Sequence, residues 1–277
     1  MQWVIRGSVY VMTRPLVMGI LNLTPDSFSD GGLFVDPERA CAEAEKMITD
    51  GADILDLGAE STRPGAVPVS SEEELKRLLP VLRKIIARCK AVISIDTTKH
   101  AVAKVCLAEG AHIINDVSGL VGSGAAMGRL IAETEAGLVF MHRRGTPETM
   151  QGLTQYGDVT QDVMCEIREM LLEARAFGIR DEQVVIDPGF GFAKDAAQNF
   201  KLLRQLDVFM EFKRPVLAGL SRKSFIGKVI NQEAADRDFG TAAAIALAYE
   251  RGAQIFRVHH VRAARDVLRV CEAVFEK

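Results

Sequence analysis

The sequence lacks the features of a disulfide-built, zinc-bound or membrane-spanning protein. Its five cysteines are odd in number and include no Cys-x-x-Cys pair, which favours reduced, buried thiols. The longest charge-free runs, such as 239–249, fall far short of the roughly 20 residues that span a bilayer. The first fifteen residues contain no apolar signal segment. We therefore expect a cytoplasmic protein with no membrane partner.

A basic excess is also absent. The 34 Lys and Arg residues are outnumbered by 37 Asp and Glu residues, which gives a net charge of −3. Because surfaces that bind nucleic acid are usually basic, we expect no nucleic-acid partner. No Ser-His-Asp order and no P-loop occurs, and the turn Gly189-Phe-Gly191 lacks the third glycine of a dinucleotide-binding motif.

The sequence does contain a strand-then-helix rhythm that repeats about eight times. Its 277 residues suit one (β/α)8 barrel, or TIM barrel, of roughly 250 residues. We predict a single α/β domain over residues 1–277, with a hairpin over 1–14, centred on Gly7-Ser8, that covers the barrel floor. The predicted strands are continuous apolar runs, as parallel strands require: 16–21, 53–57, 91–95, 112–115, 138–142, 183–187, 215–219 and 254–258.

Capping residues mark the predicted helices. Asp36 and Pro37 predict a helix that runs to Thr49. Ser71 and Glu74 have the spacing of a capping box for a helix that ends near residue 89. Further helices are expected over 98–109, 125–135, 159–177, 198–209, 263–275 and, broken, 223–251. Five glycines between a helix and the next strand predict left-handed stop positions: Gly51, Gly110, Gly137, Gly178 and Gly252.

Nearly every predicted strand ends in a side chain suited to chemistry. In a closed parallel barrel these ends meet at one rim, where the sites of such barrels lie. The residues are, in chain order, Asn22, Glu60, Asp96, Asn115, His142, Asp187, Lys223 and His259. Side chains from both ends of the chain would thus share one pocket.

Three of these residues predict a slot rich in hydrogen-bond acceptors. Asp96, Asn115 and Asp187 each end an apolar strand, and a buried carboxylate is costly unless donors meet it. A flat heterocycle with a ring N–H and an exocyclic amino group would supply those donors. The alternative is that the three side chains are helix caps or ties between loop and strand.

Two further patterns favour anion binding. The segment 219–224 (GLSRKS) leads from a strand into a helix, a place where barrels often hold anions, with Lys223 adding charge and Ser224 a hydroxyl. Arg257 and His259 are two apart on a strand and point the same way. An ordinary basic turn, and a core histidine at 259, are the alternatives.

With Asn22, Thr62 and Arg63, the Arg257/His259 pair would hold an anion of the size of pyrophosphate. A bound Mg²⁺ would then be held mainly by phosphate oxygens and water. The loops 22–32 and 60–68 are long and rich in glycine and proline, which is typical of functional lids.

Eight segments, taken in order, resemble the dihydropteroate synthase family. They are MGILNLTPDSFSDGG (18–32), ESTRPGA (60–66), SIDTTK (94–99), INDVSG (114–119), MHRRGTPETMQ (141–151), DPGFGFAK (187–194), GLSRKSFIG (219–227) and FRVHHV (256–261). The match spans essentially the whole chain, so the resemblance is specific.

The resemblance implies a TIM barrel that condenses 6-hydroxymethyl-7,8-dihydropterin pyrophosphate with p-aminobenzoate to 7,8-dihydropteroate, releasing pyrophosphate in folate biosynthesis. It implies Mg²⁺ as cofactor, with Asn22 as its protein ligand, sulfonamides as mimics of the second substrate, and a homodimer.

The implied pterin residues are Asp96, Asn115, Met141, Asp187, Phe192, Gly219 and Lys223. The implied pyrophosphate residues are Asn22, Thr62, Arg63, Arg257 and His259. The implied p-aminobenzoate residues are Phe28, Thr62, Pro64, Phe190 and Ser224.

The chemistry implied in this way assigns catalytic roles to Asp96, Asp187, Lys223, Arg257 and His259. Loss of pyrophosphate leaves a cation that the pterin ring delocalises. Two carboxylates would stabilise the cation, while Arg257, His259 and Mg²⁺ would stabilise the leaving group. Three departures from the family pattern stand at Ala193, Arg143 and His260.

Two other interpretations share the predicted slot. A methyltransferase barrel of the methyltetrahydrofolate type would not need the loops 22–32 and 60–68 or the Arg257/His259 site. A non-catalytic pterin-binding paralogue would have lost Lys223, Arg257 or the first loop, and all three are present. An aldolase-type barrel is disfavoured, because no lysine stands inside a strand to form a Schiff base.

Overall fold

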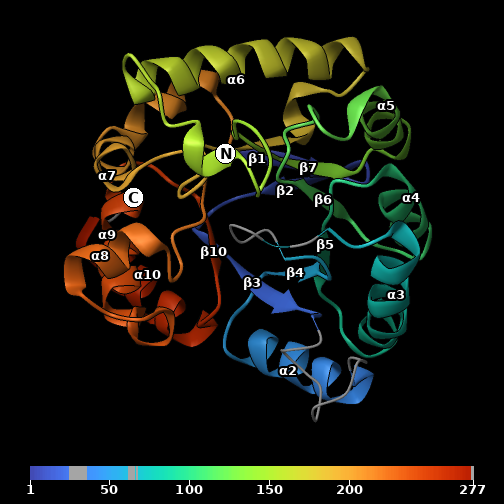
Figure 1. Ribbon diagram of the computed structural model, residues 1–277. Helices are drawn as coiled ribbons and strands as arrows, with labels where there is room; N and C mark the ends of the chain where they lie inside the picture. Colours follow the sequence, from blue (N-terminus) through green and yellow to red (C-terminus); the bar gives the residue numbers. More distant parts are fainter. Residues whose placement is uncertain (25–35, 62–65, 67, 276–277) are drawn as a thin grey trace.

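A computed structural model describes residues 1–24, 36–61, 66 and 68–275 of the chain. Figure 1 shows strands at the centre of the molecule and helices in a ring around them. The parallel sheet has the order β8-β7-β6-β5-β4-β3-β10-β9. A bridge between Ile186 and Val216, beside a hydrogen bond of 2.9 Å from the Ile186 N–H to the Pro215 carbonyl, joins β8 to β9. The predicted (β/α)8 barrel is confirmed.

All eight predicted strands are present, within two residues at each end. They are β3 (Leu16–Asn22), β4 (Ile54–Gly58), β5 (Val92–Asp96), β6 (Ile113–Asp116), β7 (Gly137–Met141), β8 (Val184–Asp187), β9 (Leu217–Ala218) and β10 (Ile255–Val258). The shortest is β9, which follows Pro215, a residue with no N–H to give to a ladder.

The α-helices follow the strands in the predicted order. They are α2 (Pro37–Thr49), α3 (Ser71–Arg88), α4 (His100–Ala108), α5 (Gly124–Thr134), α6 (Val159–Ala176), α7 (Ala196–Arg204), α8 (Ser224–Ile230), α9 (Asp238–Glu250) and α10 (Val261–Phe275). Short 3-10 helices stand at Met150–Gly152, Asp181–Gln183, Leu206–Phe212 and Ala234–Asp236. The single helix predicted over 198–209 is therefore α7 followed by a 3-10 helix. No helix in the described part of the chain is long and apolar enough to cross a membrane.

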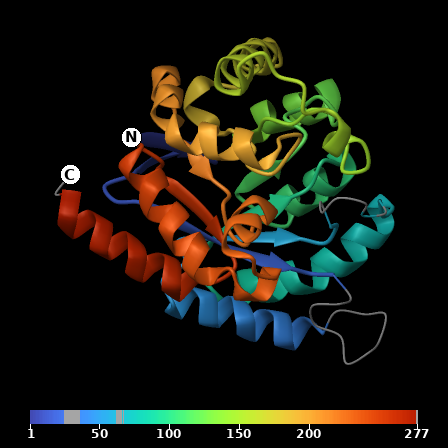
Figure 2. The same cartoon turned by 60° about the vertical axis from the view of Figure 1, so that its left-hand side comes forward.

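The N-terminal hairpin closes one end of the barrel. It pairs β1 (Gln2–Ile5) with β2 (Ser8–Val11) through a turn at Arg6 and Gly7, both left-handed, so the turn lies one residue earlier than predicted. Trp3 packs in an apolar cluster with residues at the beginnings of the strands. Its ring N–H donates to the Gln183 carbonyl at 2.8 Å. Figure 2 shows the strands running away from the hairpin, so the predicted floor is confirmed.

The two ends of the barrel interior differ in chemistry. The beginnings of the strands contribute apolar side chains such as Leu16, Ile54 and Ile113. Toward the strand ends, the buried set turns polar and comprises Asp56, Ser94, Asp96, Asn115 and Asp187. A second, larger apolar layer lies between strands and helices. The fold therefore places a polar chamber, lined by these five side chains, above a sealed floor.

Two boundary predictions were wrong. The cap of α3 is Ser70, not Ser71, because the Ser70 hydroxyl accepts the Glu73 N–H at 3.2 Å. Glu74 turns inward instead and accepts a hydrogen bond of 2.7 Å from the Lys99 ammonium.

Gly137 opens strand β7, and the left-handed residue at that junction is Glu135, with φ of 50°. The other four predicted glycine stops have positive φ.

This cap yields a stability prediction. Ser70→Ala removes the acceptor of an otherwise unpaired helix N–H and should lower the free energy of unfolding by about 1 kcal/mol. Ser71→Ala is the matched control and should change it by much less. Urea denaturation of both variants measures the difference. Equal effects would contradict the assignment of the cap.

Candidate active site

An ion-pair cluster occupies the polar chamber. The Arg257 guanidinium donates from Nε to Asp56 Oδ2 at 2.6 Å and from Nη2 to Asp96 Oδ2 at 2.7 Å. The Asn115 amide donates to the same Asp56 oxygen at 3.0 Å. Strands β4, β5, β6 and β10 each supply one of these residues. The predicted Asp96 and Asn115 thus lie together, and Arg257 joins them.

Asp187 stands at the end of β8 and is also buried. One of its carboxylate oxygens accepts the Gly189 N–H at 2.8 Å. A Cβ at Gly219 would lie 3.7 Å from the other oxygen, an ordinary van der Waals distance. Asp187 and Gly219 are therefore neighbours at the ends of adjoining strands.

Asp56 is a residue of the chamber that our sequence analysis missed. It lies in the middle of the strand segment ILDLG, whereas we sought functional residues only at strand ends. Its side chain is fully buried, and its Oδ1 has no hydrogen-bond partner within the described residues. A carboxylate inside an otherwise apolar parallel strand was the available signal, because such burial requires compensating donors.

The chamber shifts the protonation of its groups. Burial raises the pKa of Asp96 to about 7, against the lowering effect of Arg257. Burial also raises the pKa of Asp187, although the Gly189 N–H and Lys223 oppose it. For Arg257, burial is outweighed by Asp56 and Asp96, and its pKa is raised. The carboxyl groups of Asp96 and Asp187 are thus poised to accept hydrogen bonds from a ligand or to stabilise positive charge on it.

A flat apolar wall borders the carboxylates. The Lys223 ammonium lies 4.3 Å from the centre of the Phe192 ring. The Lys223 side chain keeps some exposure, yet the protein atoms around its ammonium lower its pKa to about 8. Met141 and Phe192 belong to one buried apolar cluster with Val117. The wall and the acceptors together suit a flat ring with donors along one edge.

The predicted anion site is only partly assembled by the described residues. Asn22 ends β3 and is half-buried. The His259 ring lies 2.9 Å, through Nδ1, from the Ser221 hydroxyl, and the same hydroxyl accepts the His259 N–H. Arg257 reaches down to the two aspartates. Thr62 and Arg63 lie outside the described residues.

Of the predicted p-aminobenzoate residues, the structure describes Phe190 and Ser224, and their side chains lie in different surroundings. Phe28, Thr62 and Pro64 lie outside the described residues. Ser224 is exposed at the first position of α8. Phe190 is buried in the layer between strands and helices, where its ring stacks on that of Phe225 with centroids 6.4 Å apart. Phe190 therefore sits behind the rim in this structure.

The remaining residues singled out from the sequence have structural partners. Glu60 accepts the Val69 N–H at 2.9 Å and pairs with Lys99 at 2.8 Å. His260 is exposed and faces Asp238 at 3.1 Å, away from the chamber. Ala193 has φ of 50°, the left-handed region in which glycine is favoured.

Metal ligands are sparse. Within the part of the chain that is described, no three His, Cys, Asp or Glu side chains are arranged to hold a metal ion. The Asn22 side chain at the rim offers a hard oxygen, the kind of ligand that Mg²⁺ accepts alongside phosphate and water.

Known proteins resemble this chain over nearly its full length. Residues 18–259 match the pterin binding enzyme family. Dihydropteroate synthase of Synechocystis sp. is 44% identical over 95% of this chain and 91% of its own. A Yersinia pestis dihydropteroate synthase solved with a sulfonamide drug superimposes with a TM-score of 0.92 at 38% identity, covering 100% of this chain and 99% of that one. A Xanthomonas albilineans dihydropteroate synthase in complex with 7,8-dihydropteroate gives 0.87 at 39% identity, covering 97% and 96%.

The raised pKa of Asp96 predicts how stability depends on pH. A carboxyl whose folded pKa exceeds its unfolded value stabilises the fold at low pH, and this contribution is lost as pH rises through the folded pKa. As pH rises from 5 to 8, the unfolding free energy of the parent protein should therefore fall by about 2 kcal/mol more than that of Asp96→Asn. Urea denaturation at both pH values measures this, with the exposed Asp207→Asn as control. Parallel losses in all three proteins would refute the assignment.

Proposed function

This chain belongs to the dihydropteroate synthase family, and we propose that its barrel rim condenses 6-hydroxymethyl-7,8-dihydropterin pyrophosphate with p-aminobenzoate. The products are 7,8-dihydropteroate and pyrophosphate, so the protein is a transferase of folate biosynthesis. The observation that carries the proposal is the buried acceptor cluster of Asp56, Asp96, Asn115 and Asp187, beside Lys223. This cluster matches the donor edge of a pterin.

The pterin would lie against Phe192 and Met141, with its donor edge toward the carboxylates. Its ring N–H and exocyclic amino groups would replace water as donors to Asp96 and Asp187, whose raised pKa values show how poorly they are solvated. Asn115 offers its amide oxygen, because its amino group already donates to Asp56. The Lys223 ammonium would donate to an acceptor of the ring.

The pyrophosphate would lie above the pterin, at the rim. We assign it to Asn22 and His259, with Arg257 and the loop residues Thr62 and Arg63. Arg257 would have to share its guanidinium between phosphate and the two aspartates that now hold it. Mg²⁺ would be held by Asn22 together with phosphate oxygens and water, and it would supply positive charge to the leaving group.

Catalysis would depend on charge stabilisation more than on proton transfer. When the bond to pyrophosphate breaks, positive charge spreads into the pterin, and Asp96 and Asp187 lie where they would stabilise it. The amino group of p-aminobenzoate is already unprotonated at neutral pH, so the attack needs no strong base. The loops 22–32 and 60–68, most of whose residues lie outside the described part of the chain, are assigned the role of excluding water that would otherwise trap the cation.

p-Aminobenzoate, the second substrate, would lie next to the pterin on its outer side, toward the rim. Phe28, Thr62, Pro64 and Ser224 are assigned to it, whereas Phe190 would support the site from behind through Phe225. Because the Yersinia pestis relative was solved with a sulfonamide, we propose that sulfonamides compete at the same place in this protein.

The two alternative interpretations are less well supported. A methyltransferase barrel shares the pterin slot, but relatives over nearly the full length of the chain are dihydropteroate synthases. A binding paralogue would not need the ion-paired Arg257 or the partly exposed Lys223 beside the slot.

Pyrophosphate release tests the proposed function. With dihydropterin pyrophosphate and Mg²⁺, we expect release that rises on addition of p-aminobenzoate and is matched by formation of dihydropteroate. Chelation of Mg²⁺ should slow release, because the leaving group loses its counter-charge. Tight pterin binding without any release would instead favour the binding paralogue and count against the assigned anion site.

We also propose a cytoplasmic homodimer that associates through α8, α9 and α10. Helix α9 packs against both α8 and α10, and the three helices expose large apolar side chains, which are Val229, Phe239, Leu247, Val270 and Val274. Large apolar side chains exposed on neighbouring helices are typical of an interface. Phe239 alone is 92% exposed.

The dimer proposal predicts the effect of one charge. Phe239→Asp should shift the protein toward monomer in sedimentation velocity, since burying a carboxylate in an apolar interface is costly. Leu172→Asp, on the exposed face of α6, is the matched control and should leave the mass unchanged. A monomeric parent protein, or equal masses for both variants, would contradict the proposed interface.

A further inference from the structure

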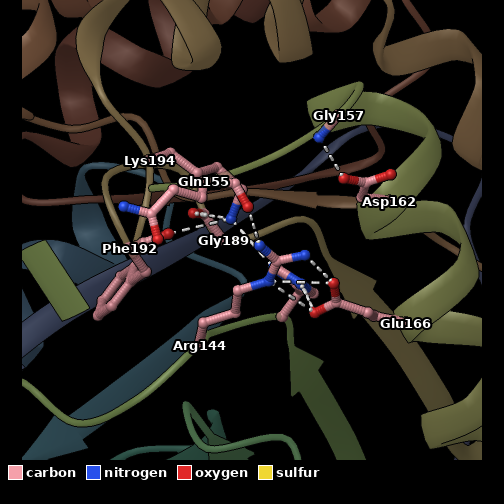
Figure 3. Close-up of polar contacts among 9 residues, drawn as sticks. Arg144, Gln155, Gly157, Asp162, Glu166, Gly189, Phe192 and Lys194 are labelled. Atoms are coloured by element: carbon pink, nitrogen blue, oxygen red, sulfur yellow. Dashed lines mark hydrogen bonds and ion pairs between the residues drawn. The ribbon is translucent and has the colours of Figure 1, made fainter. Parts of the chain in front are cut away.

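A buried lysine next to the chamber has a full set of hydrogen-bond partners. Lys194 is 4% exposed. Its ammonium lies 3.0 Å from the Gly189 carbonyl, 3.0 Å from the Phe192 carbonyl and 3.1 Å from Nδ1 of His142. Figure 3 shows Lys194 beside Gly189 and Phe192. An ammonium has three N–H donors, and this arrangement provides one acceptor for each.

The loop that these contacts hold has an unusual backbone. Gly189, Gly191 and Ala193 all have positive φ, of 75°, 81° and 50°. A Cβ at Gly189 would lie 1.9 Å from the His142 carbonyl oxygen, so the loop is pressed against the end of β7. The left-handed conformation costs an alanine roughly 1–2 kcal/mol. The loop therefore needs contacts such as those of Lys194 to stay in this shape.

The histidine partner is fixed from its other side. Because Nδ1 accepts from Lys194, the proton of neutral His142 belongs on Nε2, which lies 2.9 Å from Glu166 Oε2. Burial lowers the pKa of His142 to about 4, in agreement with a neutral ring. For Glu166, burial is outweighed by His142 and Arg144, which lower its pKa to about 2. Glu166 is therefore the ionised acceptor of this chain of contacts.

Arg144 completes the network at the surface of α6. It donates to Glu166 at 3.0 Å and to the Gln155 carbonyl at 2.6 Å, as Figure 3 shows. Its guanidinium also lies 3.8 Å from the centre of the Tyr156 ring. The network thus runs from the loop after β8, through the end of β7, to α6.

The same loop forms part of the pterin site. The Gly189 N–H donates to Asp187, and the Phe192 ring meets the Lys223 ammonium. A shift of the loop would therefore move a carboxylate and the apolar wall together. Lys194 itself faces away from the chamber, toward His142.

We propose that Lys194 is a positioning residue for the pterin substrate, acting through the loop 189–192, with Glu166 and Arg144 holding His142 as its acceptor. This inference rests on the proposed function and deepens it. The ammonium fixes the two carbonyls of the loop, and the loop in turn fixes Asp187 and Phe192. Small displacements of positioned groups are costly for catalysis, because a misplacement of 1 Å can reduce the rate about 100-fold.

A first pair of variants separates positioning from a general effect. Lys194→Met keeps the length of the side chain but removes its donors. Lys201→Met removes a lysine of α7 whose partner is the partly exposed Asp158, and it is the matched control. We expect Lys194→Met to weaken binding of dihydropterin pyrophosphate at least about 10-fold and to reduce turnover roughly 100-fold. Lys201→Met should stay close to the parent protein. Calorimetry and pyrophosphate release measure both quantities.

A pH profile supplies a readout that a merely structural lysine would not move. Burial lowers the pKa of Lys194 to about 7, Asp187 and Glu166 raise it, and Lys223 and Arg144 lower it. The working form is the ammonium, which is lost as pH rises through this pKa. Glu166→Gln removes a negative charge that raises the pKa of Lys194. The fall in turnover at alkaline pH, or alkaline limb, should therefore move to lower pH in this variant.

The possible outcomes are distinct. Parent-like pterin binding in Lys194→Met would overturn the inference. An alkaline limb that stays in place in Glu166→Gln would do the same, and this arm decides the question if Lys194→Met does not fold. A parent protein that neither binds the pterin nor releases pyrophosphate would overturn the proposed function itself. Weakened binding in Lys194→Met together with a shifted limb in Glu166→Gln supports the positioning role.

Discussion

Arg257 forms a double ion pair with Asp56 and Asp96 inside the barrel, and the polar chamber is built around it. Two carboxylates at this depth are costly unless donors meet them. Arg257 meets both, and Asn115 adds a further donor to Asp56. The cluster stays short of donors, since one oxygen of Asp56 has none within the described residues. Burial also raises the pKa of Asp96 and of Asp187, whose carboxyls keep a little exposure, so a ligand that supplies donors to these two is favoured there over an apolar molecule.

The surrounding fold closes this chamber from below and fixes its side. The hairpin and the apolar beginnings of the strands close the barrel below it. Beside it, the loop after β8 carries Asp187 at one end and Phe192 at the other, and Lys194 holds that loop from behind. Burial raises the pKa of Asp96 and Asp187 and lowers that of Lys194 and Lys223. In such surroundings, positive charge that develops on a ligand finds acceptors already in place.

Much of the fold and part of the site could be predicted from the sequence. Continuous apolar runs located the strands, and local signals such as Asp36 before Pro37 located a helix start to the residue. Asp96, Asn115 and Asp187 were identified because strand ends share one rim. Asp56 was missed because we sought functional residues only at strand ends, although a carboxylate inside an apolar strand was a local signal. Lys194 was missed because its contact with His142 joins residues 52 apart in the chain. Phe190 lies in the sequence beside site residues, yet the turn at Gly189 directs it into the outer core.

We infer that the buried carboxylates stabilise positive charge on the pterin as pyrophosphate leaves. Asp187→Asn removes a buried charge, whereas Ser224→Ala removes an exposed hydroxyl at the rim. In steady-state turnover we expect a loss of about 100-fold or more for Asp187→Asn and a far smaller loss for Ser224→Ala. Equal losses in the two variants would rule out this role of the carboxylates.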